Sequence, residues 1–296
     1  MGVYQKLRAR LEQAGIRPST RRGQNFLLDA NLLDFIVRTA DLSKDDLILE
    51  VGPGSGFLTR RLAASGCALL GVELDFGLLP IAMEETAAFP NVILIQGDIL
   101  AGKSRLNPEA VAKLEGLLAA VKPGGALKCV SNLPYSAGTP FIMNLLSSPL
   151  PWRLGVFLLQ RETAERLIAR PGGGDYGALS IQAQLAATTS LEKTAAPGSF
   201  WPVPKVESAL VRMELKPAGD RLALPWPALR ALTGAVFGAR RKILKNALRG
   251  LLEKGREAEI LNEAGLDPGG RGECLRPEDF LALARRLEAG AAGSIC

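Results

Sequence analysis

Short apolar stretches alternate with longer amphipathic ones between about residue 46 and residue 170. Compact apolar runs predict strands, and longer runs with apolar positions three or four residues apart predict helices. We expect strands at 47–51, 67–74, 92–96, 126–131 and 154–160. We expect helices starting at residue 57 and spanning 76–88, 108–121, 139–146 and 161–169. This alternation predicts an α/β fold with a mostly parallel sheet and helices on both of its faces.

The pattern changes toward the C-terminus. A helix is expected at 176–187, and period-two spacing at 207–215 predicts a late, antiparallel strand. Residues 216–227 contain three prolines and a glycine, which predict a domain boundary. The chain is therefore expected to divide into domain 1–216 and a small all-helical domain, 217–296.

Two helical features are expected within this second domain. Apolar residues at steps of three, four or seven predict one helical face, formed by Leu229, Leu232, Val236, Ile243, Ala247 and Leu251. A last helix is expected at 277–289, started by Pro277 and stopped by Gly290.

Positive charge is concentrated at two places on an otherwise slightly acidic chain whose net charge is +6. Residues 1–22 carry six Lys or Arg against one Glu, and residues 240–249 carry five with no acid. Each cluster alone is better explained as solvated surface. Together they favour contacts with nucleic acid, and we expect 1–22 to form a basic N-terminal arm.

Cysteine and histidine usage excludes several kinds of site. The chain has no histidine, and its four cysteines are scattered, so we expect no zinc or other metal and no Ser-His or Cys-His nucleophile. Cys67 and Cys129 lie in apolar runs and are expected to be buried and reduced. There is neither a signal-peptide pattern nor an apolar stretch of about 18 residues, so a cytoplasmic protein without membrane contact is expected.

Residues 50–56 read Glu-Val-Gly-Pro-Gly-Ser-Gly, between an expected strand and an expected helix. Such a loop can cradle a cofactor or can simply be a tight turn. Two acids favour a cofactor: Glu73 ends the second strand, where it can bind ribose hydroxyls, and Asp98 follows the third, where it can accept from an adenine amino group. The G-x-G-x-G spacing favours S-adenosylmethionine over NAD.

The tetrapeptide Asn132-Leu133-Pro134-Tyr135 follows the fourth expected strand. The Asn132 side-chain oxygen and the Leu133 carbonyl can each accept one N–H of an aromatic amino group, which orients its nitrogen for methylation. Pro134 restricts the direction of both acceptors. Tyr135 offers a flat face for a flipped-out base.

These motifs, in this order, resemble one family, the ribosomal RNA adenine dimethyltransferases, whose bacterial member modifies 16S rRNA. The resemblance runs from about residue 20 to residue 250. It covers the segments 23–29, 50–59, 72–75, 97–98, 132–140, 160–162, 200–209 and 240–248.

The resemblance implies a Rossmann-like seven-stranded methyltransferase sheet with a helical C-terminal domain that binds rRNA. It also implies dimethylation of N6 on two adjacent adenosines near the 3′ end of 16S rRNA, in the small subunit or its precursor, by a monomer. Cofactor contacts are carried over to Asn25, Leu27, Gly52, Gly54, Glu73, Asp98 and Asn132. The target-base site is carried over to Asn132, Leu133, Pro134, Tyr135 and Phe200. RNA contacts are expected from Arg21, Arg22, Arg240, Arg241, Lys242 and Lys245.

The sequence departs from the family pattern at 136–138, at Arg161 and at 201–203, which surround the expected target pocket. Three alternatives remain at this point: a 23S rRNA adenine methyltransferase, a DNA adenine methyltransferase and a mainly non-catalytic small-subunit assembly factor. The Pro-rich block 200–209 and the helical domain favour the 16S enzyme. The size of the region beyond residue 216 disfavours a DNA enzyme.

Overall fold

The computed structural model describes residues 3–18, 23–102, 104–217, 220, 223–252 and 254–293. Its contacts divide the chain into two compact units. The first comprises Met1–Ala164 and Ser190–Leu215, and the second comprises Glu165–Thr189 and Lys216–Cys296. None of the described helices is long and apolar enough to cross a membrane.

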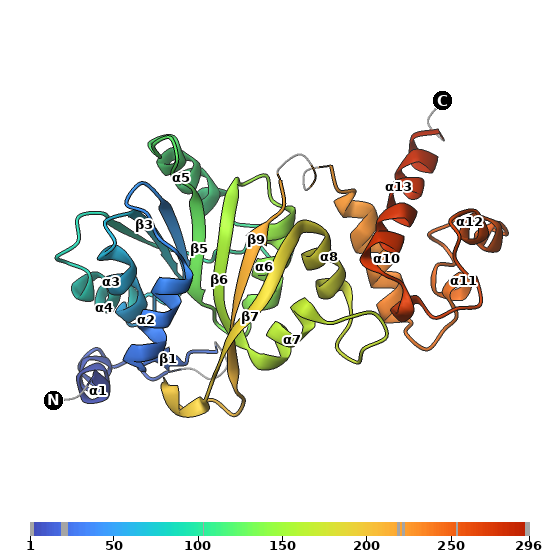
Figure 1. The fold of residues 1–296 in the computed structure, drawn as a ribbon. Helices are drawn as coiled ribbons and strands as arrows, with labels where there is room; N and C mark the ends of the chain where they lie inside the picture. Colours follow the sequence, from blue (N-terminus) through green and yellow to red (C-terminus); the bar gives the residue numbers. More distant parts are fainter. Residues whose placement is uncertain are drawn as a thin grey trace. The chain divides into compact units, whose positions relative to one another are not determined.

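Seven strands form one sheet, in the order β4-β3-β2-β5-β6-β9-β7. Figure 1 shows β3, β5, β6, β9 and β7 of this sheet side by side. Its strands are β2 (Leu47–Val51), β3 (Ala68–Glu73), β4 (Val92–Gln96), β5 (Leu127–Asn132), β6 (Trp152–Gln160), β7 (Ala187–Ala195) and β9 (Ser208–Leu215). Strands β2 to β6 pair in parallel, and β9 is antiparallel to β6. The expected α/β sheet and its late antiparallel strand are confirmed.

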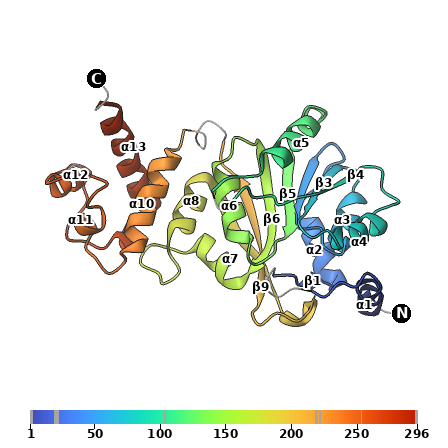
Figure 2. The same ribbon diagram turned by 180° about the vertical axis from the view of Figure 1, so that it is seen from behind.

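Alternating side chains of the strands bury both faces of the sheet. Val156 and Leu158 of β6 belong to the cluster that includes Leu33 of α2 (Ala30–Thr39) and Leu58 of α3 (Phe57–Ala63). Phe157, between them, points the other way, and its ring meets Phe141 of α6 (Gly138–Ser147) edge-on. Figure 2 shows α6 on the face of the sheet opposite α2.

The remaining helices of the α/β region follow the expected order. They are α4 (Leu78–Glu85), α5 (Pro108–Leu118) and α7 (Arg161–Ile168). Helix α5 begins as the sequence suggests, because the Asn107 side chain accepts from Glu109 N and Pro108 occupies the first turn. Cys67 and Cys129 are buried free thiols, as expected.

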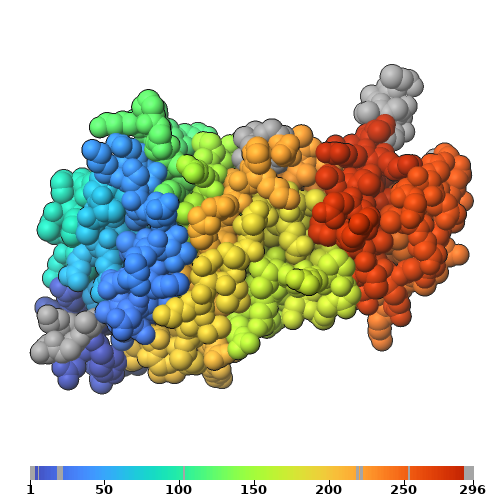
Figure 3. Space-filling view, in the orientation of Figure 1, coloured from blue at the N-terminus to red at the C-terminus, as the bar shows by residue number. Residues whose placement is uncertain are grey.

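The N-terminal segment, expected as a basic arm, contains a docked helix, α1 (Val3–Gln13). Leu7 and Leu11, four residues apart, are each 1% exposed and pack into the core. Arg10 forms an ion pair with Glu85 at 2.6 Å, so part of the positive charge is neutralised internally. Figure 3 shows α1, in dark blue, beside the yellow segment near residue 200. Arg21 and Arg22 lie outside the described residues.

Two short strands and one long strand were missed by the sequence pattern. Strand β1 (Phe26–Leu27) pairs antiparallel with β8 (Phe200–Trp201), and two residues are too few to show a period. Strand β7 is nine residues long but lies at the edge of the sheet, where most of its side chains are exposed or half-buried. It therefore lacks the apolar alternation that predicts a strand.

In the described part of the second unit, four helices are joined by mutual contacts, and α12 (Glu257–Glu263) packs beside one of them. The four are α8 (Ala178–Ala186), α10 (Trp226–Gly238), α11 (Leu244–Ala247) and α13 (Pro277–Gly293). Phe237 of α10 stacks on Phe280 of α13, with ring centroids 6.1 Å apart. Tyr176 meets Phe237 edge-on and donates its hydroxyl to the Leu275 carbonyl at 2.9 Å.

Two expectations for this unit are wrong. The helical face expected through residues 229–251 is interrupted between Gly238, which ends α10, and Leu244, which begins α11. The last helix starts at Pro277 as expected but continues past Gly290 to Gly293. A glycine inside a helix costs only about 1 kcal/mol relative to alanine, and two alanines follow Gly290, so the helix is not stopped there.

Candidate active site

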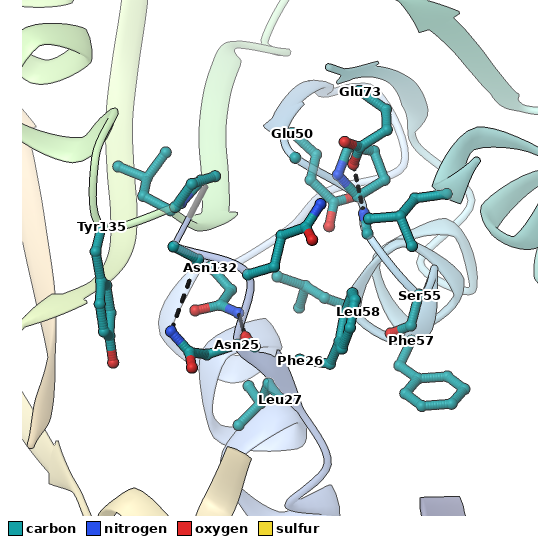
Figure 4. A pocket seen from close by; sticks show the side chains of 18 of the residues that line it. Asn25, Phe26, Leu27, Glu50, Ser55, Phe57, Leu58, Glu73, Asn132 and Tyr135 are labelled. Atoms are coloured by element: carbon teal, nitrogen blue, oxygen red, sulfur yellow. Dashed lines mark hydrogen bonds between the residues drawn. The ribbon is translucent and has the colours of Figure 1, made fainter. Parts of the chain in front are cut away.

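A pocket lies at the carboxyl ends of β2, β3 and β5, the edge at which open α/β sheets bind ligands. Three segments form its walls: residues 23–27, the glycine loop 52–55 and residues 132–135 (Figure 4). We call residues 23–27 the strap, because they join α1 to the fold along one side of this pocket. The pocket thus brings together Asn25, Leu27, Gly52, Gly54, Glu73, Asn132, Leu133, Pro134 and Tyr135.

The glycines of the loop are required by conformation and by close packing. Gly52 and Gly54 have φ of 70° and 58°, in the left-handed region. A Cβ on Gly52 would lie 3.2 Å from Pro134 Cγ, and one on Gly54 would lie 3.4 Å from the Phe26 ring. The loop therefore presses directly against the tetrapeptide on one side and the strap on the other.

Glu73 is held rigidly at the end of β3. Its Oε2 accepts from Gly54 N at 2.8 Å, and its Oε1 accepts from Asp75 N at 2.9 Å. Burial raises the pKa of this carboxyl, while the two backbone N–H groups oppose the rise. Each oxygen keeps a second lone pair, so the group can still accept from two adjacent hydroxyls.

Glu50 lines the same pocket and was not recognised from the sequence as a functional residue. It is 1% exposed, and burial raises its pKa to about 8. Its Oε2 has no hydrogen-bond partner within the described part of the chain. The signal was present: an acid in the buried stretch Leu-Ile-Leu-Glu-Val has to be explained by something other than packing.

A second hollow adjoins the first and contains Asp98. The two hollows share Gln24, Gly52, Glu73 and Pro134. Asp98 is exposed, and its Oδ1 accepts from Leu100 N at 2.9 Å. Its other oxygen, Oδ2, can accept from a ligand. All the cofactor residues expected from the sequence therefore line one of two adjoining hollows.

Asn132 is oriented by the strap. Its Nδ2 donates to the Asn25 carbonyl at 3.1 Å, and Figure 4 shows the two side chains together. Because the amide nitrogen is occupied, Oδ1 is the acceptor that Asn132 can offer to a ligand. The turn that follows is closed by Ala137 N and Gly138 N on the Pro134 carbonyl, at 2.9 and 3.1 Å. These bonds do not use the Leu133 carbonyl.

Tyr135 lines the pocket at the end away from Glu50 and Glu73 (Figure 4). Its hydroxyl shares a hydrogen bond of 2.7 Å with Ser208 Oγ at the start of β9. Burial raises the pKa of this phenol. Gly23 packs against the backbone here, since a Cβ at this position would lie 2.8 Å from Tyr135 N.

Phe200, expected to stack on the target base, lies in the hydrophobic core. It is 2% exposed, and its backbone pairs with Leu27 in the small sheet β1-β8. Its side chain is therefore not accessible to a ligand in this structure, and its backbone pairs with the strap. Among the residues that depart from the family pattern, Arg161 forms an ion pair with Glu207 at 2.7 Å, and Trp201 stacks on Phe26.

The basic cluster of the second unit contains residues of two kinds. Arg240 donates to the carbonyls of Gly173 and Gly174 at 2.8 Å each and to Glu273 at 3.1 Å. It therefore holds a glycine-rich loop of its own unit. Exposed side chains without an ion pair among the described residues follow it: Arg241, Lys242 and Lys245.

The glycine loop after β2, the buried acid ending β3 and the amide ending β5 stand on a seven-stranded Rossmann-like sheet. Together they define an S-adenosylmethionine-dependent methyltransferase. The sequence profile of the family described as "Ribosomal RNA adenine dimethylase" matches residues 17–289. The chain belongs to this family.

Named relatives agree in sequence along almost the whole chain. A "Ribosomal RNA small subunit methyltransferase A" of Anaeromyxobacter dehalogenans (strain 2CP-C) is 39% identical over 286 residues, covering 96% of this chain and 98% of the relative. A protein of the same name from Pelotomaculum thermopropionicum is 40% identical over 285 residues, covering 95% of each chain.

Solved structures show the same fold. A dimethyladenosine transferase from Plasmodium falciparum superposes with a TM-score of 0.72 at 22% identity, covering 90% of this chain and 98% of that one. The 23S rRNA methyltransferase ErmE superposes with a TM-score of 0.60 at 24% identity, covering 89% and 100%. At these identities the likeness supports the fold alone.

Proposed function

We propose that this protein transfers methyl groups from S-adenosylmethionine to N6 of two adjacent adenosines near the 3′ end of 16S rRNA. The observation that carries the proposal is the Asn132–Tyr135 loop, whose amide acceptor adjoins the glycine-loop pocket. Membership of the rRNA adenine dimethylase family and relatives named for the small subunit support this substrate over 23S rRNA or DNA.

Within the proposed function, the two hollows hold the cofactor. Glu73 would accept the two ribose hydroxyls, because its oxygens are fixed by backbone donors and keep free lone pairs. Asp98 would accept the adenine amino group in the adjoining hollow. Asn25, Leu27, Gly52 and Gly54 would surround the methionine moiety.

The cofactor supplies a methyl group already activated as a sulfonium, so the protein needs no strong general base. Its task is positioning and electrostatic stabilisation. The target amine would donate to Asn132 Oδ1 and to the Leu133 carbonyl, which favours a pyramidal nitrogen as the N–C bond forms and the methyl–sulfur bond breaks, with its electron pair left on sulfur. The displaced amine proton passes to water, and Tyr135 holds the base by stacking.

Dimethylation adds a requirement on the same acceptors. The monomethyl amine returns with one N–H fewer, so it can satisfy only one of the two acceptors. The pocket must therefore accommodate rotation about the C6–N6 bond of the adenine. Residues 136–138, which depart from the family pattern, lie beside this pocket, with Ser136 and Ala137 lining the second hollow.

The proposed partner is 16S rRNA in the small subunit or its precursor, bound by a monomer. The exposed cations Arg241, Lys242 and Lys245 are the proposed phosphate contacts of the C-terminal domain, 217–296, together with Arg21 and Arg22 of the N-terminal segment. Arg240 is proposed to act indirectly, since its guanidinium is already bound within its own unit.

A labelling experiment tests the proposal. Purified protein is incubated with S-adenosylmethionine labelled at the methyl group and with undermethylated small subunits, large subunits or duplex DNA. We expect label in small subunits, recovered as N6,N6-dimethyladenosine after digestion. Label confined to large subunits or DNA would overturn the choice of substrate, and RNA binding without any label would indicate an assembly factor.

A further inference from the structure

Among the described residues, two buried carboxyl groups line the pocket, Glu50 and Glu73, and the proposed reaction assigns a role to Glu73 but none to Glu50. Glu50 occupies the fourth position of β2 and lines the pocket with the glycine loop (Figure 4). Its Oε2 lacks a hydrogen-bond partner in the described part of the chain, and so does Oγ1 of Thr59, which lies beside it in α3 and is fully buried. A buried, unpartnered carboxyl that lines a ligand site is costly, unless a ligand changes its surroundings.

The surroundings of Glu50 oppose a negative charge. Burial is the main cause of its raised pKa, the Thr59 hydroxyl acts against the rise, and the negative charge of Glu73 on the neighbouring strand adds to it. Among the described residues, Glu73 is the charged group that acts on Glu50, and α3 contributes the neutral Thr59. Without a ligand, Glu50 is therefore largely protonated near pH 7.

The substrate cofactor and its product differ by one positive charge. S-adenosylmethionine has a sulfonium where S-adenosylhomocysteine has a neutral thioether, and the rest of the two molecules is the same. A positive charge placed in a pocket favours the ionised form of a nearby carboxyl group. The group that can respond is one whose surroundings favour its neutral form and which has an oxygen without a hydrogen-bond partner, as Oε2 of Glu50 is among the described residues.

We propose that Glu50 senses the charge of the cofactor, releasing its proton when S-adenosylmethionine binds and keeping it when S-adenosylhomocysteine binds. This inference rests on the proposed function. The step is a proton transfer: the Glu50 O–H bond breaks, its electron pair stays on the carboxylate, and the proton passes to buffer. The carboxylate then attracts the sulfonium ligand, whereas the protonated acid gives the thioether product no such attraction.

Calorimetric titration with each ligand tests the inference at about pH 7, in phosphate and in Tris, whose ionisation heats differ. The difference in heat between the buffers gives the number of protons released. We expect release of roughly 0.5 to 1 proton more for S-adenosylmethionine than for S-adenosylhomocysteine. The α-amino group occurs in both ligands, and any proton that it contributes is the same with the natural protein and with a Glu50 variant.

Two variants make the assignment specific. Glu50→Gln keeps the shape of the side chain but cannot ionise, and it should abolish the difference in proton release and narrow the affinity ratio of the two ligands by about tenfold. Glu115→Gln removes an exposed acid of α5 and should change neither quantity.

Equal proton release with both ligands in the natural protein, or an undiminished difference in Glu50→Gln, would overturn the inference. If Glu50→Gln fails to fold, the comparison of the two ligands in the natural protein decides alone. Failure to bind either ligand would instead overturn the proposed function, and this inference with it.

Discussion

At the scale of single residues, two polar side chains of the pocket are arranged in opposite ways. Asn132 is fixed, since its amide nitrogen is bound to the Asn25 carbonyl and one acceptor is left for a ligand. Glu50 is left without a fixed partner on Oε2, so its charge depends on what the pocket contains. The fixed amide of Asn132 is suited to orienting a substrate. The carboxyl of Glu50 is suited to changing its protonation when a ligand binds.

Asn132→Ala should reduce the rate of methyl transfer by about a hundredfold to a thousandfold. The substitution removes a hydrogen-bond acceptor that stabilises the charge developing on the amine. Binding of 16S rRNA should stay within a few-fold of the natural protein. Single-turnover transfer and filter binding measure the two effects. Asn262→Ala, an exposed amide in α12, is the control. Transfer at the natural rate in Asn132→Ala would contradict the orienting role.

Glu50→Gln should stabilise the ligand-free protein at neutral pH. Because burial raises the pKa of Glu50 from 4.5 to about 8, the folded state binds more protons than the unfolded state between these values. Stability is therefore lost as pH rises through this window, by an amount on the order of a few kcal/mol.

Thermal unfolding of Glu50→Gln and of the natural protein at several pH values measures this effect. The two melting temperatures should be similar near pH 4.5 and should diverge, with the variant higher, toward pH 8. A constant difference across this range would show that ionisation of Glu50 is not its cause.

At the scale of elements, the strap and the β5–α6 loop are built against each other. Gly23 has φ of 64°, and a Cβ there would lie 2.8 Å from Tyr135 N, a backbone atom that cannot move aside cheaply. Gly15 has a similar φ of 67° but open space around it. Comparing substitutions at Gly23 and Gly15 therefore distinguishes the strain of a positive φ, which both share, from the steric effect on the pocket, which only Gly23 has.

Gly23→Ala should therefore weaken binding of S-adenosylmethionine by roughly tenfold or more, equivalent to about 1.4 kcal/mol. Gly15→Ala carries the same backbone strain, of about 1–2 kcal/mol, and should leave the affinity almost unchanged. Equilibrium binding to both variants gives the comparison. Equal losses in the two would mean that strain alone, and not contact with Tyr135, is responsible.

The sequence predicted the elements whose side chains are buried periodically and missed those held by few contacts. Strands β2 to β6 and β9 followed from apolar runs, and the pocket followed because 50–56, Glu73 and Asn132 all terminate such strands. Strand β7 escaped because it is a largely polar edge strand. Phe200 was assigned to the pocket from resemblance, while its burial and its pairing with Leu27 place it in the core beside the strap.

At the scale of the whole molecule, the clustered positive charge has two uses that sequence alone could not separate. Arg10 forms an ion pair within the first unit, and Arg240 donates hydrogen bonds to carbonyl groups within the second. Arg241 and Lys245 remain exposed, with no ion pair among the described residues. A count of charges therefore overstates the number available to bind phosphate.

Arg240→Ala should destabilise the protein by about 2 kcal/mol, because it leaves loop carbonyls and Glu273 without their donor. Arg241→Ala should leave the melting temperature unchanged and weaken rRNA binding. Its plot of log affinity against log salt concentration should become shallower by about 0.7–0.9 if a single phosphate contact is lost. Unfolding scans and salt titrations of both variants are the measurements, and a reversed pattern would contradict these assignments.

The stacking of Trp201 on Phe26 has an optical consequence. Phe26 lines the pocket, and the Trp201 ring also meets Tyr4 of α1 edge-on, so this indole sits where the strap and the N-terminal helix converge. Trp152, by contrast, is 2% exposed and donates to the Leu145 carbonyl within the core. The emission of Trp201 should thus report ligand entry, without an added dye, in a background where the other two tryptophans, Trp152 and Trp226, are replaced by Phe. The ligand-dependent signal should vanish when Trp201→Phe is added.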